Sequence, residues 1–119
     1  MIIKIFHASY WELKIRNFRW WLQRGKRGWS ECDSWNIDTW FMDTLLPMLT
    51  SYRKHHIGYP GYITFNEWNQ ILDRMIYLLK EMKEDDFSTE DIAKSYEHRN
   101  NCKDEFFKLF SEYFYHLWD

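Results

Sequence analysis

The chain has 119 residues, a length that fits one domain with a modest hydrophobic core and that requires no metal or disulfide for folding. Its 16 Lys and Arg residues nearly balance 18 Asp and Glu residues, which argues against a nucleic-acid-binding protein of the usual, strongly basic kind. Cys32 and Cys102 lie outside any CxxC motif, and the apolar start MIIKIFHASY is too short for a signal peptide or a membrane span. We therefore expect a soluble, cytoplasmic protein with two free cysteines and no association with the membrane.

Four hydroxyl residues stand three positions ahead of a carboxylate, a spacing that typically starts a helix because each side chain can bond an exposed N–H of the first turn. They are Ser9, Ser30, Thr64 and Ser88. Apolar residues at helical spacing follow each of them. The sequence therefore predicts an all-α fold, a single-domain bundle of about four helices over residues 1–119, in which residues 1–8 form either a short strand or an extended arm.

The first helix is expected from about Tyr10 to Arg24, where Gly25 can end it. Its apolar residues step by four, three and four positions and predict one buried stripe, formed by Trp11, Ile15, Phe18 and Leu22. Cations and one indole lie off the stripe: Arg16, Arg19, Trp20, Arg24, Lys26 and Arg27. Guanidinium groups beside indoles can stack on a base and grip a phosphate. Alternatively, these arginines pair with the chain's own acids, and Trp20 or Trp21 belongs to the core.

A Gly-Trp corner at Gly28 and Trp29 leads into the second helix, expected from near Glu31. Apolar residues cover a wide arc of this helix, so it should be central to the bundle. Pro47 should kink or break it. By spacing, Asp38 shares the buried face with Trp35, and a buried carboxylate needs a partner. We expect that partner to be Arg24 or Arg27, which gives Asp38 a structural role in preference to a ligand-binding one.

Residues His55 to Ile63 are expected to form a loop, followed by a third helix from Phe65 to about Glu84 and a fourth from about Thr89 to Leu117. Tyr59 in this loop either contacts a partner or plugs the end of the bundle. His98 and Cys102 share a helix face but lack the further ligands that a zinc site needs. No catalytic motif appears, so we expect no enzyme, cofactor or metal.

The run RWWLQRGKRGWSECDSWNIDTWFMDTLLPMLTSYR, followed by GYPGYITFNEWNQILDRMI, resembles a family of small bacteriophage and prophage proteins over about residues 18 to 84. The matching positions are Arg24, Gly28, Trp29, Trp35, Asp38, Pro47, Tyr59, Pro60 and Trp68. The resemblance implies no activity and no residue roles. It does imply a phage accessory protein that acts in the bacterial cytoplasm, where such proteins commonly bind and disable host defences.

These observations lead to a non-enzymatic binding protein as the functional hypothesis. The expected binding residues are Arg16, Arg19, Trp20, Arg24, Arg27, Trp29 and Tyr59, with Trp35, Asp38 and Pro47 as structural residues. The first expectation is capture of an anionic nucleotide at the basic aromatic corner. The same surface could instead block a host protein, or bind nucleic acid, and the aromatic surplus could form a homo-oligomer interface.

Overall fold

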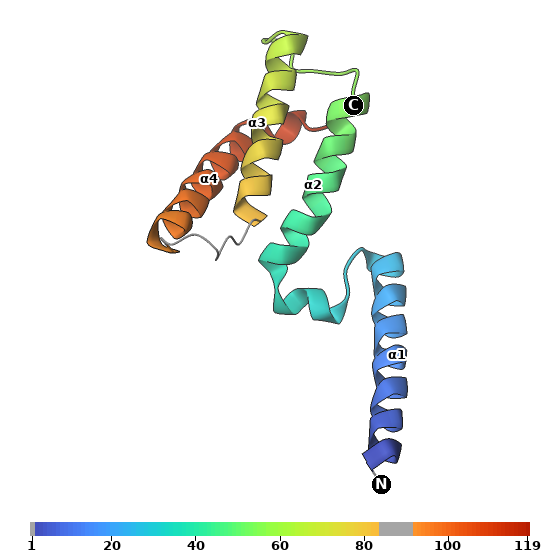
Figure 1. Ribbon diagram of the computed structural model, residues 1–119. Coiled ribbons are helices and arrows are strands. Elements are labelled where there is room, and N and C mark those ends of the chain that lie inside the picture. The colour runs from blue at the N-terminus through green and yellow to red at the C-terminus, as the bar shows by residue number, and fades with distance from the viewer. Residues whose placement is uncertain (1, 84–91) are drawn as a thin grey trace. The chain divides into compact units, whose positions relative to one another are not determined.

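The computed structural model describes the backbone of residues 2–83 and 92–119, and the side chains from Tyr10 onward within these ranges. The elements follow in the order α1 (Ile2–Arg27), η1 (Glu31–Trp35), α2 (Ile37–His55), α3 (Phe65–Lys83), α4 (Ile92–Tyr113) and η2 (Phe114–His116), where η marks a 3₁₀ helix (Figure 1). The described residues contain four α-helices and no strand, which confirms the expected all-α class. None of these helices is both long and apolar enough to cross a membrane.

Two compact units make up the chain, Met1–Trp40 and Phe41–Asp119, and the boundary between them lies inside α2. A single domain over residues 1–119 stays a prediction.

Helix α1 is longer than expected at both ends. It begins at Ile2 rather than near Tyr10, so the Ser9 pattern lies inside the helix and does not start it. It also continues through Gly25, because a glycine weakens a helix by only about 1 kcal/mol and does not by itself end it. The helix ends at Gly28, whose φ of +83° favours glycine and whose N–H donates to the Arg24 carbonyl at 2.9 Å.

The predicted stripe on α1 is exposed rather than buried within this unit. The exposed fractions are 54% for Trp11, 67% for Ile15, 59% for Phe18 and 39% for Leu22. Periodicity identifies an apolar face correctly, but it does not say whether the chain supplies something to cover that face.

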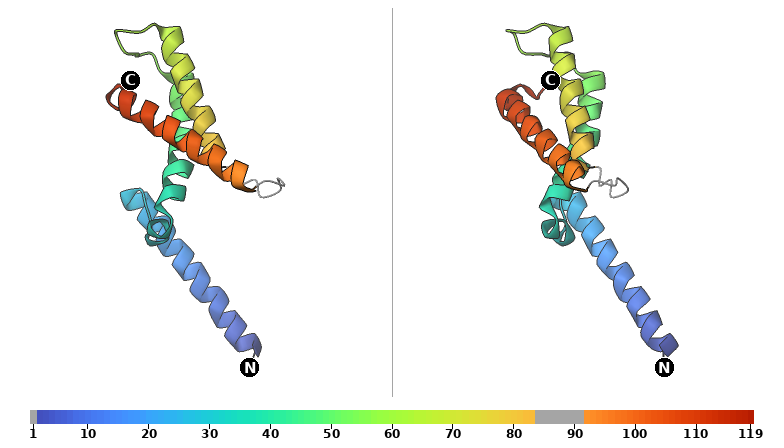
Figure 2. Two further views of the ribbon diagram at one scale, coloured as in Figure 1. Left: turned by 90° about the vertical axis from the view of Figure 1, so that its left-hand side faces the viewer. Right: turned by 60° about the vertical axis from the view of Figure 1, so that its left-hand side comes forward.

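Helix α3, rather than α2, is the central helix of the second unit. Six of its residues are buried: Trp68, Leu72, Met75, Leu78, Leu79 and Met82. The expected central position of the second helix is therefore wrong, because α2 buries only Leu49 completely and α4 only Cys102 and Phe106. Figures 1 and 2 show α3 lying between α2 and α4, so both neighbours cover it.

Pro47 does not break α2, which runs continuously from Ile37 to His55. The proline removes one backbone hydrogen bond on the exposed side of the helix, where water can bind the freed carbonyl group. On the opposite side, Leu49 and the partly buried Leu45 and Leu46 pack against the core around α3. That packing outweighs the missing bond.

The expected loop is present between His55, where α2 ends, and Phe65, where α3 begins. The Thr64 start signal is confirmed, because the Glu67 N–H donates to the Thr64 hydroxyl at 3.1 Å and that hydroxyl lies 3.0 Å from the Glu67 carboxylate. Asp119 accepts hydrogen bonds from the N–H groups of Ile57 and Gly58, at 2.8 and 2.7 Å. These bonds hold the residues after η2 against the loop.

The fourth helix is described from Ile92 onward, and the expected start at Ser88 and Thr89 lies outside the described residues. It gives way to the short η2 at Phe114, earlier than the expected end at Leu117. The free state expected for Cys32 and Cys102 is confirmed.

The two methionines Met75 and Met48 provide a matched test of this core. Met75 is completely buried on α3, whereas Met48 is 58% exposed on α2. We expect Met75→Ala to lower the free energy of unfolding by about 2–5 kcal/mol, because it leaves a cavity among close-packed side chains. Met48→Ala should change it by less than about 0.5 kcal/mol. Urea denaturation followed by circular dichroism measures both, and an equal loss in the two variants would contradict this core.

Candidate functional site

The candidate site is the corner, by which we mean residues Gly28 to Trp40 after α1. Its first anchor is Ser30, which is completely buried. The Ser30 N–H and hydroxyl both donate to Oδ2 of Asp33, at 2.8 and 3.0 Å, and the Asp33 N–H donates back to the Ser30 carbonyl at 3.0 Å. The start signal at Ser30 is therefore confirmed, but the turn that follows is the 3₁₀ helix η1 rather than an α-helix.

The predicted burial of Trp35 and Asp38 is wrong, and so is the predicted pairing of Asp38 with Arg24 or Arg27; a structural role for either residue stays a prediction. Trp35 is 66% exposed, and Asp38 is exposed in the first turn of α2. The helix is interrupted at Asn36, so the spacing of 3.6 residues per turn does not continue from Trp35 into α2. An aspartate in the first turn of a helix is stabilised by the helix dipole and needs no arginine partner.

Arg24 pairs with Asp33 rather than Asp38. The guanidinium makes two bonds to the carboxylate, from Nε to Oδ2 at 3.0 Å and from Nη2 to Oδ1 at 2.8 Å. These bonds, with those from Ser30, hold the pKa of Asp33 well below its usual range although desolvation opposes the shift. Hydrogen bonding to Asp33 likewise raises the pKa of Arg24. The predicted arginine clasp exists, but with a carboxylate five residues earlier in the chain.

A second predicted binding residue, Arg19, also pairs with an acid of the corner, because its Nη2 lies 2.9 Å from Oε2 of Glu31. Glu31 in turn donates its N–H to the Gln23 side chain at 2.9 Å. Two of the expected ligand-binding arginines, Arg19 and Arg24, therefore contribute to folding the corner onto α1.

Arg27 and Arg16 lie against indoles instead. Cζ of Arg27 is 3.8 Å from the ring centroid of Trp29, and its Nε donates to the Trp29 carbonyl at 3.0 Å. Cζ of Arg16 is 4.5 Å from the ring of Trp20. Among the residues that the structure describes, neither arginine pairs with a carboxylate. The positive charge of each is therefore open to a contact with another molecule.

Trp20 is partly buried, and its ring meets Trp35 edge-on at a centroid distance of 5.5 Å. Its Nε1 is buried without a hydrogen-bond partner in the described part of the chain. Trp21, the other indole considered for the core, is 66% exposed. Of the two, Trp20 is thus the one whose side chain packs against the corner.

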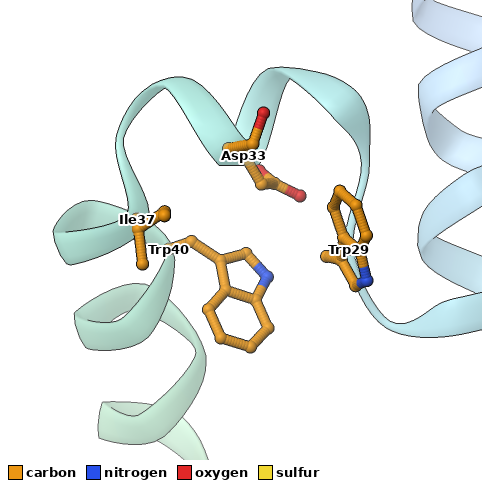
Figure 3. A pocket seen from close by; sticks show the side chains of 5 residues that line it. Trp29, Asp33, Ile37 and Trp40 are labelled. Atoms are coloured by element: carbon orange, nitrogen blue, oxygen red, sulfur yellow. The ribbon is translucent and has the colours of Figure 1, made fainter.

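A shallow hollow of about 280 Å³ lies in the corner (Figure 3). Its lining residues are Trp29, Asp33, Ser34, Ile37 and Trp40. Sequence reasoning assigned Trp29 to a binding site but missed Ile37 and Trp40. Ile37 and Trp40 are three positions apart, so both lie on one face of the first turn of α2. This spacing could have identified them from the sequence.

Three side chains around the hollow, those of Trp40, Ser34 and Asp33, already have polar partners inside the chain. Nε1 of Trp40 donates to the Gly28 carbonyl at 3.3 Å, and the Ser34 hydroxyl donates to the Glu31 carbonyl at 2.6 Å. Asp33 is occupied by Arg24 and Ser30, as described above. What the hollow offers to another molecule is therefore mainly the apolar surface of two indoles and an isoleucine.

Tyr59 is not part of the corner, because it belongs to the unit Phe41–Asp119. Its side chain is 50% exposed and meets Phe65 edge-on at 5.6 Å. The tyrosine thus packs on one side and is open to solvent on the other. Contact with a partner and closure of the bundle's end both stay predictions for it.

No group of three or more His, Cys, Asp or Glu residues in the described ranges could hold a metal ion. Cys102 and His98 have the composition of a nucleophilic pair, and Sγ of Cys102 lies 3.6 Å from Nε2 of His98. Burial and the nearby Glu81 raise the pKa of the Cys102 thiol, which disfavours the reactive thiolate.

The Arg24–Asp33 pair gives a prediction about the stability of the corner. Asp33→Asn removes the negative charge that pairs with Arg24, so we expect the local stability to fall. The loss should be only about 1 kcal/mol, because Arg24 is half exposed and solvent weakens the pair. Asp38→Asn, on an exposed residue, should change little. Hydrogen exchange of the Asp33 and Asn36 amides measures this local stability, and equal effects of the two variants would contradict the assignment.

The same pair predicts a pH dependence. The pKa of Asp33 is lower in the folded chain than its unfolded value of about 3.9. The contribution of Asp33 to the stability of the corner is therefore fully present when the pH is above this unfolded value. The contribution is lost as the pH falls through the lowered folded pKa. In a carboxyl NMR titration of the folded chain, we expect the pKa of Asp33 to lie well below its unfolded value.

Comparison with protein-family models, with curated proteins and with solved structures finds no match to this chain. The resemblance to bacteriophage proteins therefore stays a prediction.

Proposed function

We propose that this chain is a non-enzymatic binding protein whose corner accepts an apolar or aromatic side chain of a partner protein. The observation that supports this proposal is the hollow between Trp29 and Trp40, where the polar side-chain groups of Asp33, Ser34 and Trp40 are bonded within the chain. A ligand in such a hollow gains mainly from removal of apolar surface from water. Tryptophan is also among the residues that contribute most to protein–protein binding.

Positive charge near the hollow adds a preference for the partner's chemistry, because Arg27 stacks on the lining residue Trp29. Arg27 and Lys26 are exposed and have no carboxylate partner among the described residues. Acidic residues beside the partner's apolar anchor would meet these cations, which increases the association rate and helps to orient the complex. The resemblance to phage proteins suggests a bacterial host protein as this partner.

A nucleotide is the second candidate ligand, and the stack of Arg27 on Trp29 favours it. The exposed indole face could stack on a base while the guanidinium grips a phosphate. Two observations place it second. Arg24 is already held by two bonds to Asp33, and the hollow has few polar groups left to recognise a base. Binding of single-stranded nucleic acid would use the same stack and stays a prediction.

Trp29 provides the test of the protein-binding proposal. We expect Trp29→Ala to weaken retention of a host protein from bacterial lysate by at least about tenfold, because it removes one wall of the hollow. Trp118→Ala is the matched control, since Trp118 is 71% exposed but lies in the other unit. Quantitative mass spectrometry measures the retained protein, and equal retention by both variants would rule out the corner as the binding site.

The nucleotide candidate has a separate test in a thermal-shift screen with cyclic and ADP-ribose-type nucleotides. A nucleotide that binds the folded chain raises its melting temperature by mass action. We expect Arg27→Ala to remove that rise and Lys83→Ala to preserve it, because Lys83 pairs with Asp43 in the other unit. A flat response of the unmodified chain across the library would end the nucleotide candidate and leave the protein-binding proposal standing.

A further inference from the structure

One face of α1 contacts the corner, and the opposite face is exposed within this unit. The side chains of Trp20, Gln23 and Arg24 contact the corner and hold it against one side of the helix. The apolar stripe lies on the other side, where Ile15 and Phe18 are 67% and 59% exposed. A continuous row of large exposed apolar residues is uncommon on a monomer and marks an interaction surface.

The spacing of the stripe fits a helix that pairs with another helix. Steps of four, three and four place the stripe at the successive core positions d, a, d and a of a heptad repeat, in the order Trp11, Ile15, Phe18 and Leu22. On this register Glu12, Arg19 and Lys26 occupy e positions, and Lys14 and Trp21 occupy g positions. These e and g residues flank the stripe and would face a partner helix.

We propose that α1 pairs with α1 of a second copy of this chain, in antiparallel orientation. Antiparallel packing of core positions places Ile15 opposite Phe18 of the second copy, and Trp11 opposite Leu22. The same register places Glu12 opposite Arg19 of the second copy, and the symmetry of the pair produces this contact twice. The helix thus complements itself in both shape and charge.

Charge also selects the antiparallel orientation over the parallel one. In a parallel pair, a g residue faces the e residue five positions later, which would bring Lys14 against Arg19 of the second copy. These like charges repel, and symmetry would again double the effect. Only the antiparallel pair replaces this repulsion with attraction between Glu12 and Arg19.

Arg19 is available for this contact although it already pairs with Glu31. Both members of that pair are largely exposed, at 61% and 52% of their side-chain surface, and such pairs contribute little to stability. Arg19 can therefore be shared between Glu31 and Glu12 of the second copy. This inference concerns the stripe and does not rest on the function proposed for the corner.

A charge exchange tests the pairing without changing the apolar stripe. Sedimentation equilibrium over a concentration series should show a reversible dimer of the full chain. We expect Glu12→Arg and Arg19→Glu each to raise the dimer dissociation constant by about tenfold, because each places like charges opposite each other twice. The double variant should restore the original dissociation constant to within about threefold, because the attraction is re-formed with its signs exchanged.

Glu31→Gln is the control for the intrachain pair, and it should leave the dimer as tight as in the unmodified chain or make it tighter. A chain that is monomeric at every concentration would overturn the proposal. So would a double variant that fails to recover. Tighter association of Arg19→Glu alone would indicate parallel pairing, in which the repulsion from Lys14 is relieved, and would equally overturn the antiparallel assignment.

Discussion

Asp33 accepts hydrogen bonds from Arg24 and from both donors of Ser30, and the geometry of the first unit depends on these contacts. Each contact has a local origin in the sequence. Gly28 provides the positive φ that ends α1, Ser30 and Asp33 start the next turn, and Arg24 is one helical turn before the glycine. A short sequence can therefore form a defined corner, because the bonds described for it join residues no more than twelve positions apart.

The corner decides which groups remain for another molecule. Arg24 and Arg19 pair with the acids Asp33 and Glu31 of the corner, whereas Arg16 and Arg27 lie against indoles and pair with no carboxylate among the described residues. The hollow between Trp29 and Trp40 results from the same turn. The basic aromatic segment thus divides into a structural part and a part that is open to a partner, and this division favours an apolar anchor over a strongly anionic ligand.

Self-association through the stripe would leave the corner accessible, because the two use different sides of α1. A dimer would then present two corners, and a partner with two matching segments could bind both at once with increased apparent affinity. The aromatic surplus of the chain is explained in part by these two surfaces. Other rings belong to the second unit, where Phe41, Phe106 and Phe110 pack against one another.

The sequence by itself determined the helical class, the start signals at Ser30 and Thr64 and the apolar stripe on α1, because these features depend on spacing along a single element. It also predicted a clasp between Arg24 or Arg27 and an aspartate of the corner. Only the tertiary structure decided that the aspartate is Asp33, that α3 is the central helix, and that the stripe stays exposed within its unit. The physical reason is that periodicity defines the faces of a helix, whereas burial depends on which neighbours the chain brings to each face. The helix is interrupted at Asn36, so the spacing that starts at Trp35 does not predict which way the residues of α2 face. For this reason the predicted burial of Asp38 is wrong.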